Sequence, residues 1–212
     1  MPESSLSAVF VAAVDRGALP PRPRAELDSY LDATARCVLR YGWSRTSPQD
    51  IAREAGVNRT TIYRVLGAKD EIFHLLVDRE VHRLIEQAAQ HGVAVRESGA
   101  SVVEAIVELA ASAIEQVRNN PMFAKLLADE PELVASFMRG GIPEVLERFT
   151  EVLGPCLGAA MERGVVAERD PYLLTEWIVR LCLSLLFAPP RVELRVFLAA
   201  GVLPLFEVES AR

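Results

Sequence analysis

Residues 46–73, TSPQDIAREAGVNRTTIYRVLGAKDEIF, place two helix starts and a helix stop within one short stretch. Ser47 and Pro48 suit a helix start, because serine caps free amides and proline fits the first turn. Gly56 ends that helix, since glycine adopts the left-handed conformation with little strain. Asn58 caps the next helix almost immediately. Two short helices joined so tightly must cross steeply, which predicts a helix-turn-helix.

The second of these helices is predicted to present a polar outer face. Ala52, Val57 and Ile62 fill the wedge between the helices, which turns hydrogen-bond donors and two cations outward. Such side chains suit phosphates and base edges in a major groove. We therefore predict a DNA-binding unit. Its predicted contact residues are Thr46, Ser47, Asn58, Arg59, Thr60, Thr61, Tyr63, Arg64 and Lys69.

Roles can be assigned within this set. Arg59, Thr60, Thr61 and Arg64 are expected to reach base edges, whereas Thr46, Ser47, Tyr63 and Lys69 are expected to hold phosphates. Lys69 precedes a long helix, so its ammonium and the first free amides suit one phosphate.

The segments TSPQDIAREAGVNRTTIY and GAKDEIF resemble the DNA-binding domain of the TetR family of bacterial transcriptional regulators. With LDATARCVLRYGWSRTS before them, the resemblance covers about residues 27–75. It implies a repressor that forms a homodimer through a four-helix bundle of the last two helices, about residues 170–206. It also implies that Lys69 contacts the DNA backbone. Val65 departs from the family, which usually has an aromatic residue or histidine there, so one phosphate contact is missing.

The 212 residues carry a net charge of −6, which is unevenly distributed. Residues 1–83 hold 12 Lys and Arg against 11 Asp and Glu, whereas residues 84–212 hold 11 against 18. The acidic part is expected to stay off DNA. Affinity would then come from local clustering of Arg45, Arg59, Arg64 and Lys69.

The cysteine count and the hydropathy indicate the compartment in which the protein is expected to work. Cys37, Cys156 and Cys182 are odd in number and far apart, which argues against a disulfide framework or a zinc cluster and favours a reducing cytoplasm. No apolar run approaches the ~20 residues that span a bilayer, so no membrane association is expected.

Apolar residues recur at helical spacing, and hardly any segment alternates with period two, so the chain is predicted to be all-α. Three parts are expected: an N-terminal extension (1–23) that ends with Pro20, Pro21 and Pro23, a three-helix DNA-binding domain (24–70), and a helical regulatory domain for ligand binding and dimerisation (71–212). The predicted helices span residues 24–41, 48–55, 58–66, 69–90, 101–119, 122–128, 131–140, 142–163, 171–188 and 191–206, with 91–99 as a connector and a kink or split at Gly154–Pro155.

The regulatory domain is predicted to enclose a small-molecule effector, which the resemblance implies. Glu147, Arg148 and Arg180 are possible polar anchors. The candidate lining residues are Met122, Phe123, Phe137, Met138, Phe149, Met161 and Trp177. Because they recur at helical spacing, these residues equally suit a simple hydrophobic core.

Two other functions remain open. A row of His74, Asp78 and His82 on one helix face could hold a metal in an enzyme, but the two-turn spacing is poor for that purpose and a solvated polar face explains it better. No catalytic constellation or cofactor motif is recognised, which predicts a non-enzyme without cofactor. The second alternative is a ligand-binding or protein-interaction module that has lost DNA specificity. The weak basic balance and Val65 favour it.

Overall fold

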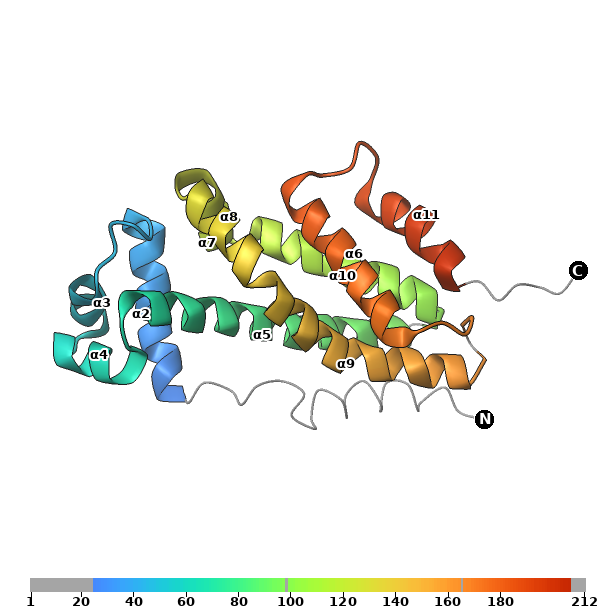
Figure 1. Ribbon diagram of the computed structural model, residues 1–212, viewed down its shortest axis with the longest axis horizontal. Coiled ribbons are helices and arrows are strands. Elements are labelled where there is room, and N and C mark those ends of the chain that lie inside the picture. Colours follow the sequence, from blue (N-terminus) through green and yellow to red (C-terminus); the bar gives the residue numbers. More distant parts are fainter. Residues whose placement is uncertain (1–24, 98, 165, 207–212) are drawn as a thin grey trace, which may run out of the picture. The chain divides into compact units, whose positions relative to one another are not determined.

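The computed structural model describes residues 25–97, 99–164 and 166–206 (Figure 1), so the predicted extension 1–23 lies outside the described residues. Within those ranges the chain forms ten α-helices and no strand, which confirms the all-α prediction. None of these helices combines the length and the hydropathy that a membrane span requires. The helices are α2 (Ala25–Tyr41), α3 (Pro48–Ala55), α4 (Arg59–Leu66), α5 (Lys69–Glu97), α6 (Val102–Asn119), α7 (Pro121–Asp129), α8 (Pro131–Gly140), α9 (Ile142–Glu162), α10 (Pro171–Phe187) and α11 (Leu194–Phe206).

The described chain divides into two compact units. The head unit contains the described residues up to Arg83 together with Arg118–Ile142, and the body unit contains Leu84–Val117 and the described residues from Pro143 onward. These units differ from the predicted division after residue 70. The first half of α5 and the α7–α8 hairpin pack with the N-terminal helices, and such long-range packing leaves no local mark in the sequence.

The helix-turn-helix of the head unit forms where the capping residues predict it. Ser47 and Asp50 make a reciprocal capping box at the start of α3, and Asn58 caps α4. Gly56 ends α3 with φ of 70°, in the left-handed region. Ile62 and Leu66 of α4 are buried, so this helix turns its other face outward.

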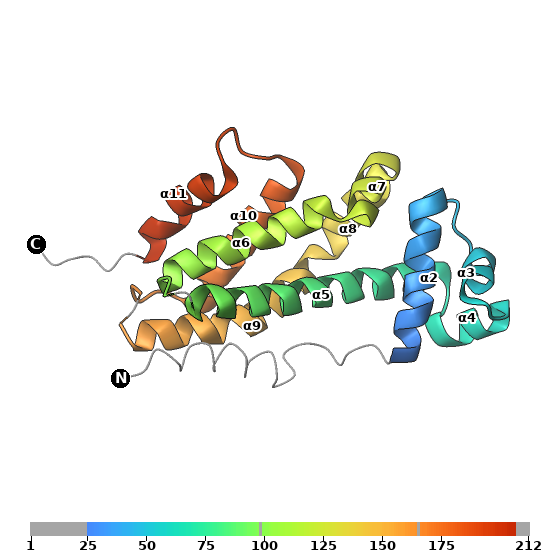
Figure 2. The same cartoon turned by 180° about the vertical axis from the view of Figure 1, so that it is seen from behind.

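The head core continues beyond the helix-turn-helix. Trp43 lies under the motif with its ring 5.0 Å from that of Phe73. Phe137 of α8 stacks edge-on against Phe73 at 6.4 Å, and α7 packs on α2 (Figure 2). Cys37 is buried in this core, and burial raises the pKa of its thiol.

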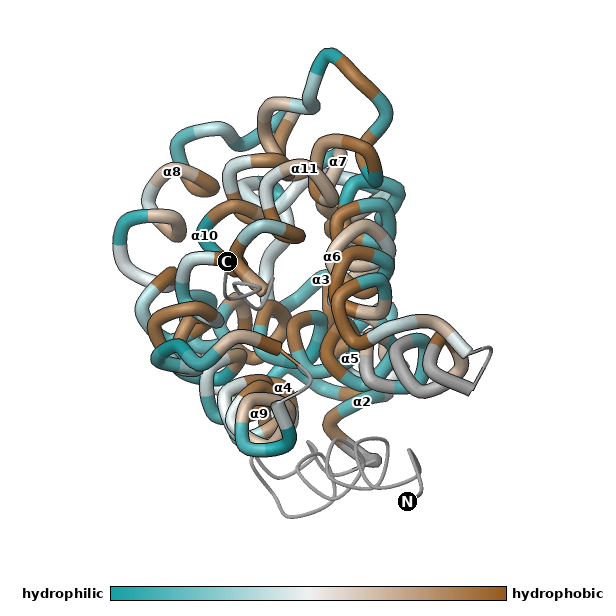
Figure 3. Tube along the Cα trace, turned by 90° about the vertical axis from the view of Figure 1, so that its right-hand side faces the viewer, coloured by the Kyte–Doolittle hydropathy of each residue, from teal (hydrophilic) through white to brown (hydrophobic). Residues whose placement is uncertain are grey.

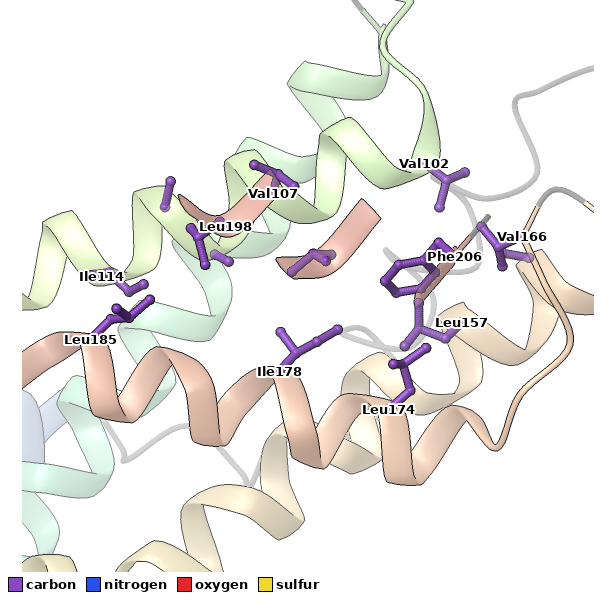
Figure 4. Packing of buried hydrophobic residues seen from close by; sticks show 14 residues of the cluster. Val102, Val107, Ile114, Leu157, Val166, Leu174, Ile178, Leu185, Leu198 and Phe206 are labelled. Atoms are coloured by element: carbon purple, nitrogen blue, oxygen red, sulfur yellow. The ribbon is translucent and has the colours of Figure 1, made fainter. Parts of the chain in front are cut away.

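The body unit has its own apolar core from α6, α9, α10 and α11. Hydrophobic residues recur along α6 and α10 (Figure 3). Phe206 at the end of α11 lies beside Leu157 and Leu174, and Ile114 of α6 faces Leu185 of α10 (Figure 4). At the edge, Arg195 of α11 donates to Glu115 and Glu108 of α6 at 2.7 and 2.9 Å, so α11 is also tied to α6 by ion pairs.

Three predicted boundaries are wrong. Helix α5 continues through residues 91–97, because a single interior glycine such as Gly92 costs only about 1 kcal/mol. Of the kink or split predicted at Gly154–Pro155, the split is wrong, because α9 is one helix with Pro155 inside it; a proline removes one backbone hydrogen bond while those of its neighbours persist. Helix α11 begins at Leu194, where the Glu193 carboxylate accepts from the amides of Arg195 and Val196.

Candidate nucleic-acid interface

The outward face of α4 carries polar and cationic side chains. Arg59, Thr60, Tyr63 and Arg64 are exposed on a helix whose opposite side is held in the core by Ile62 and Leu66. A short helix anchored from below in this way presents its side chains rigidly, which is what readout of base edges requires.

Arg59 and Tyr63 form a pair, four residues apart on this face. The Arg59 guanidinium donates to the Tyr63 hydroxyl at 2.9 Å, and its Cζ lies 5.0 Å from the centre of the Tyr63 ring. The tyrosine hydroxyl accepts from arginine and still has its own proton to donate. One side chain predicted to hold a phosphate is therefore in contact with one predicted to reach a base.

Asn58 and Thr61 interact with each other at the start of α4. The Asn58 Oδ1 accepts from the Thr61 amide at 2.8 Å and from the Thr61 hydroxyl at 3.0 Å. In this geometry both residues shape the helix start. Their predicted DNA contacts stay predictions.

The predicted phosphate residues before α3 are engaged within the protein. Thr46 is buried, and its hydroxyl donates to the Gly42 carbonyl at 2.7 Å while its amide donates to the Trp43 carbonyl at 3.0 Å. The Ser47 hydroxyl donates to the Asp50 carboxylate at 2.5 Å, and this contact lowers the pKa of Asp50. A phosphate at either side chain would have to compete with these bonds.

Lys69 lies at the start of α5, next to the turn that leads into α3. Its Nζ donates to the Ser44 carbonyl at 3.0 Å and lies 5.2 Å from the centre of the Trp43 ring. The Glu71 carboxylate accepts from the Ala68 amide at 2.6 Å, so part of the predicted anion site at this helix start is occupied by the chain itself.

The same turn receives a contact that sequence reasoning missed. The Ser44 amide donates to Glu130 Oε1 at 2.7 Å, and the Ser44 hydroxyl donates to Glu130 Oε2. The two residues are 86 positions apart, so no local pattern could have indicated the pairing.

The predicted effector-lining residues are divided between the two units. Met122 is buried in the head core, Phe137 packs against that core, and Phe123 and Met138 are half-buried in the same unit. In the body unit Met161 packs against the core, Phe149 is half-buried and Trp177 is exposed. Their common role stays a prediction.

The polar residues proposed for other roles are also placed. Arg180, a possible polar anchor for the effector, pairs with Glu176 within α10 at 2.6 Å. His74 is exposed but His82 is buried, so the predicted solvated row on α5 is wrong at His82. Among the described residues, no group of three His, Cys, Asp or Glu side chains is arranged to hold a metal ion.

Large apolar side chains are exposed on α10 and α11. Leu173 and Trp177 lie four residues apart on α10, and Val196 and Leu203 lie seven apart on α11. We call the following residues the α10–α11 apolar surface: Leu173, Trp177, Phe187, Val196, Phe197 and Leu203.

The sequence of this chain is similar to those of known proteins. Residues 31–76 match the family described as bacterial regulatory proteins, tetR family. The HTH-type transcriptional regulator AlkX of Mycobacterium tuberculosis is 29% identical over 200 residues, which cover 89% of this chain and 88% of that protein.

Two solved structures share the fold. The TetR family repressor AlkX of a Dietzia strain is 21% identical with a TM-score of 0.57, over 83% of this chain and 90% of that chain. FadR of Bacillus subtilis is 18% identical with a TM-score of 0.60, over 85% and 98%. The family match coincides with the helix-turn-helix, and a known transcriptional regulator is similar along most of the chain, so residues 31–76 are a DNA-binding domain of the TetR type and the protein is a DNA-binding transcriptional regulator.

Proposed function

We propose that this chain is a homodimeric repressor that binds an inverted-repeat operator and is released by a small apolar or amphipathic ligand. The observation that carries the proposal is the outward surface of α4, where Arg59, Thr60, Tyr63 and Arg64 are exposed above a buried anchor. Each subunit would place α4 in a major groove, with the half-sites about 34–36 Å apart. The protein would act in the cytoplasm, without catalysing a reaction.

The residues divide by role. Arg59, Thr60 and Arg64 would contact base edges, with Asn58 and Thr61 at the helix start near them. Tyr63 and Lys69 would hold phosphates, and Thr46 and Ser47 would contribute where the internal bonds of their turn open. The domain that binds DNA would extend over residues 24–70, and residues 71–212 would bind the ligand and the second subunit.

Dimerisation would use about residues 170–206. The α10–α11 apolar surface supports this, because exposed apolar side chains gathered on two helices mark a protein interface more often than a solvated face. An isologous pairing of two copies of α10 and α11 would form a four-helix bundle and place the two α4 helices symmetrically.

The names of two related structures support a ligand with a long hydrocarbon chain. The Dietzia AlkX is described as implicated in biodegradation of n-alkanes, and the Bacillus subtilis FadR was solved in complex with stearoyl-CoA. In the body unit Phe149 and Met161 are the candidate contacts, whereas Met122, Phe123, Phe137 and Met138 belong to the head unit and Trp177 to the α10–α11 apolar surface. The ligand would act only through unequal affinity for the DNA-binding and released states.

Selection of bound duplexes from a random pool at moderate salt tests the DNA-binding part of this proposal. Enrichment of an inverted repeat is the expected result, with an affinity that falls steeply as salt increases. Recovery of no motif would overturn the proposal and favour a module without DNA specificity. Addition of a long-chain fatty acyl compound to the recovered complex would then test release.

A further inference from the structure

The α7–α8 hairpin packs on the DNA-binding helices within the head unit. Met122 and Leu126 of α7 are buried in the same core as Leu31 and Trp43, and Phe137 of α8 lies against Phe73. The hairpin belongs to the later half of the sequence and is joined at both ends to chain segments of the body unit.

Glu130 stands at the joint of this hairpin. Its amide donates to the Leu126 carbonyl at 2.9 Å and its carbonyl accepts from the Val134 amide at 3.1 Å, so its backbone both ends α7 and begins α8. A side chain on a backbone fixed from both sides has few directions open to it. Its carboxylate reaches Ser44 and accepts hydrogen bonds from the Ser44 amide and the Ser44 hydroxyl.

The Ser44 peptide is held on its other side by Lys69. The Lys69 ammonium donates to the Ser44 carbonyl at 3.0 Å. The turn also fits closely beneath the carboxylate, since a Cβ added at Gly42, whose φ is +82°, would lie 3.3 Å from Glu130 Oε1. Ser44 is thus fixed between an acidic and a basic side chain, three residues before the cap of α3.

We propose that Glu130 is a positioning residue for DNA binding. It fixes the Ser44 turn, and through this turn it sets the start of α3 and the ammonium of Lys69 at the phosphate backbone. The inference rests on the proposed function, because those groups are the phosphate contacts assigned there. The α7–α8 hairpin then adjusts DNA affinity without touching DNA.

Three neutralising variants test the role of the carboxylate. Glu130→Ala removes both acceptors, Glu130→Gln keeps one acceptor with the same charge change, and Glu132→Ala removes an exposed carboxylate two residues away. Any loss of a carboxylate near DNA strengthens binding non-specifically, so Glu132→Ala is the reference. Relative to it, Glu130→Ala should bind the operator and a random duplex about tenfold more weakly. The DNA affinity of Glu130→Gln should lie between the affinities of Glu130→Ala and Glu132→Ala.

Two further readouts separate positioning from general damage. The ratio of the affinity for operator to the affinity for random duplex should be the same in Glu130→Ala and in the wild type, because phosphate contacts carry no sequence information. Hydrogen exchange at the Ser44 amide should accelerate, while the Val57 amide, bonded to the Ala52 carbonyl at 3.0 Å, stays protected. Exchange that accelerates at both amides would show an unfolded head and would overturn the specific role.

The outcomes distinguish the two proposals. Suppose that the DNA affinity of the wild type falls steeply as salt increases, and that Glu130→Ala binds as tightly as Glu132→Ala. The positioning role is then wrong and the repressor proposal stands. If the wild type binds no duplex, both are overturned. A Glu130→Ala variant that binds more tightly than Glu132→Ala would mean that the carboxylate competes with phosphate instead of arranging its site.

Discussion

The head and body units expose opposite kinds of side chain on helices built by the same periodicity. On α4 the outward residues are polar or cationic, among them Arg59 and Arg64, whereas those on α10 and α11 include large apolar side chains, among them Leu173 at 66% exposure and Val196 at 59%. A helix buries whichever face its own core needs, so the chemistry of the remaining face indicates the partner. The head is suited to a nucleic acid and the body to another protein surface.

The largest expected effect comes from charging the body surface. The double variant Leu173→Glu, Val196→Glu should be monomeric by light scattering, because buried carboxylates without partners oppose association. Operator affinity should fall by about 10²- to 10⁴-fold as the two linked half-site contacts are lost. Leu39→Glu, which charges an exposed leucine of the head, is the control and should remain dimeric. A dimeric double variant would place the interface elsewhere.

The next effect concerns base readout by the head. Arg59→Ala should reduce discrimination between operator and random duplex by about 1–3 kcal/mol. Tyr63→Phe keeps the ring under the guanidinium but removes the hydroxyl that accepts from Arg59, so it should weaken all binding and reduce discrimination by less. Equal losses for Arg59→Ala on operator and random duplexes would contradict a base-reading role.

Each unit contains a serine capping box, which allows a matched test of local stability. Ser47→Ala should destabilise the head by about 1 kcal/mol. Ser101→Ala should destabilise the body in the same direction, since Ser101 and Glu104 cap α6 reciprocally. Trp43 and Trp177 lie in different units, so their fluorescence during urea unfolding can report the two effects separately.

These effects should depend on pH. Hydrogen bonds from Ser47 and Ser101 lower the pKa of Asp50 and of Glu104, so each box contributes fully above the ordinary carboxyl pKa of about 4. That contribution is lost as pH falls through the lowered pKa. The difference between wild type and each serine variant should therefore shrink below about pH 4. A constant difference down to pH 2 would mean that the carboxylates do not take part.

The smallest effect is expected at the ion pairs of α11. Arg195→Lys loses the planar fork that reaches Glu108 and Glu115 together, but these side chains are partly exposed, so the cost should be under about 1 kcal/mol. Thermal unfolding can measure it. Arg191→Lys, at an exposed position before α11, is the control and should be neutral. A larger cost would show that α11 depends on this network more than on its apolar contacts.

The parts of the fold that can be predicted from the sequence are those determined by interactions between residues close together in the chain. Ser47, Gly56 and Asn58 determine helix ends through bonds to neighbours three or four residues away, so both motif helices were predicted correctly. Gly92 and Pro155 do not end their helices, although local propensity disfavours both residues there. Their local costs are about 1 and 3 kcal/mol, which packing of a long helix can offset.

The candidate DNA surface was predictable for the same reason, since the outward face of α4 follows from helical spacing alone. Its internal contacts were not. The pairing of Arg59 with Tyr63 depends on rotamers, and the burial of Thr46 depends on a turn that closes over Gly42.

By itself the sequence determined an all-helical chain, a helix-turn-helix with a polar outer face, and an apolar pair of helices at the end. Each of these follows from spacing and capping within a few residues. Only the tertiary structure decided that the α7–α8 hairpin packs in the head unit and that Glu130 holds Ser44. Contacts between residues 86 positions apart depend on how cores assemble, and a linear pattern carries no record of that assembly.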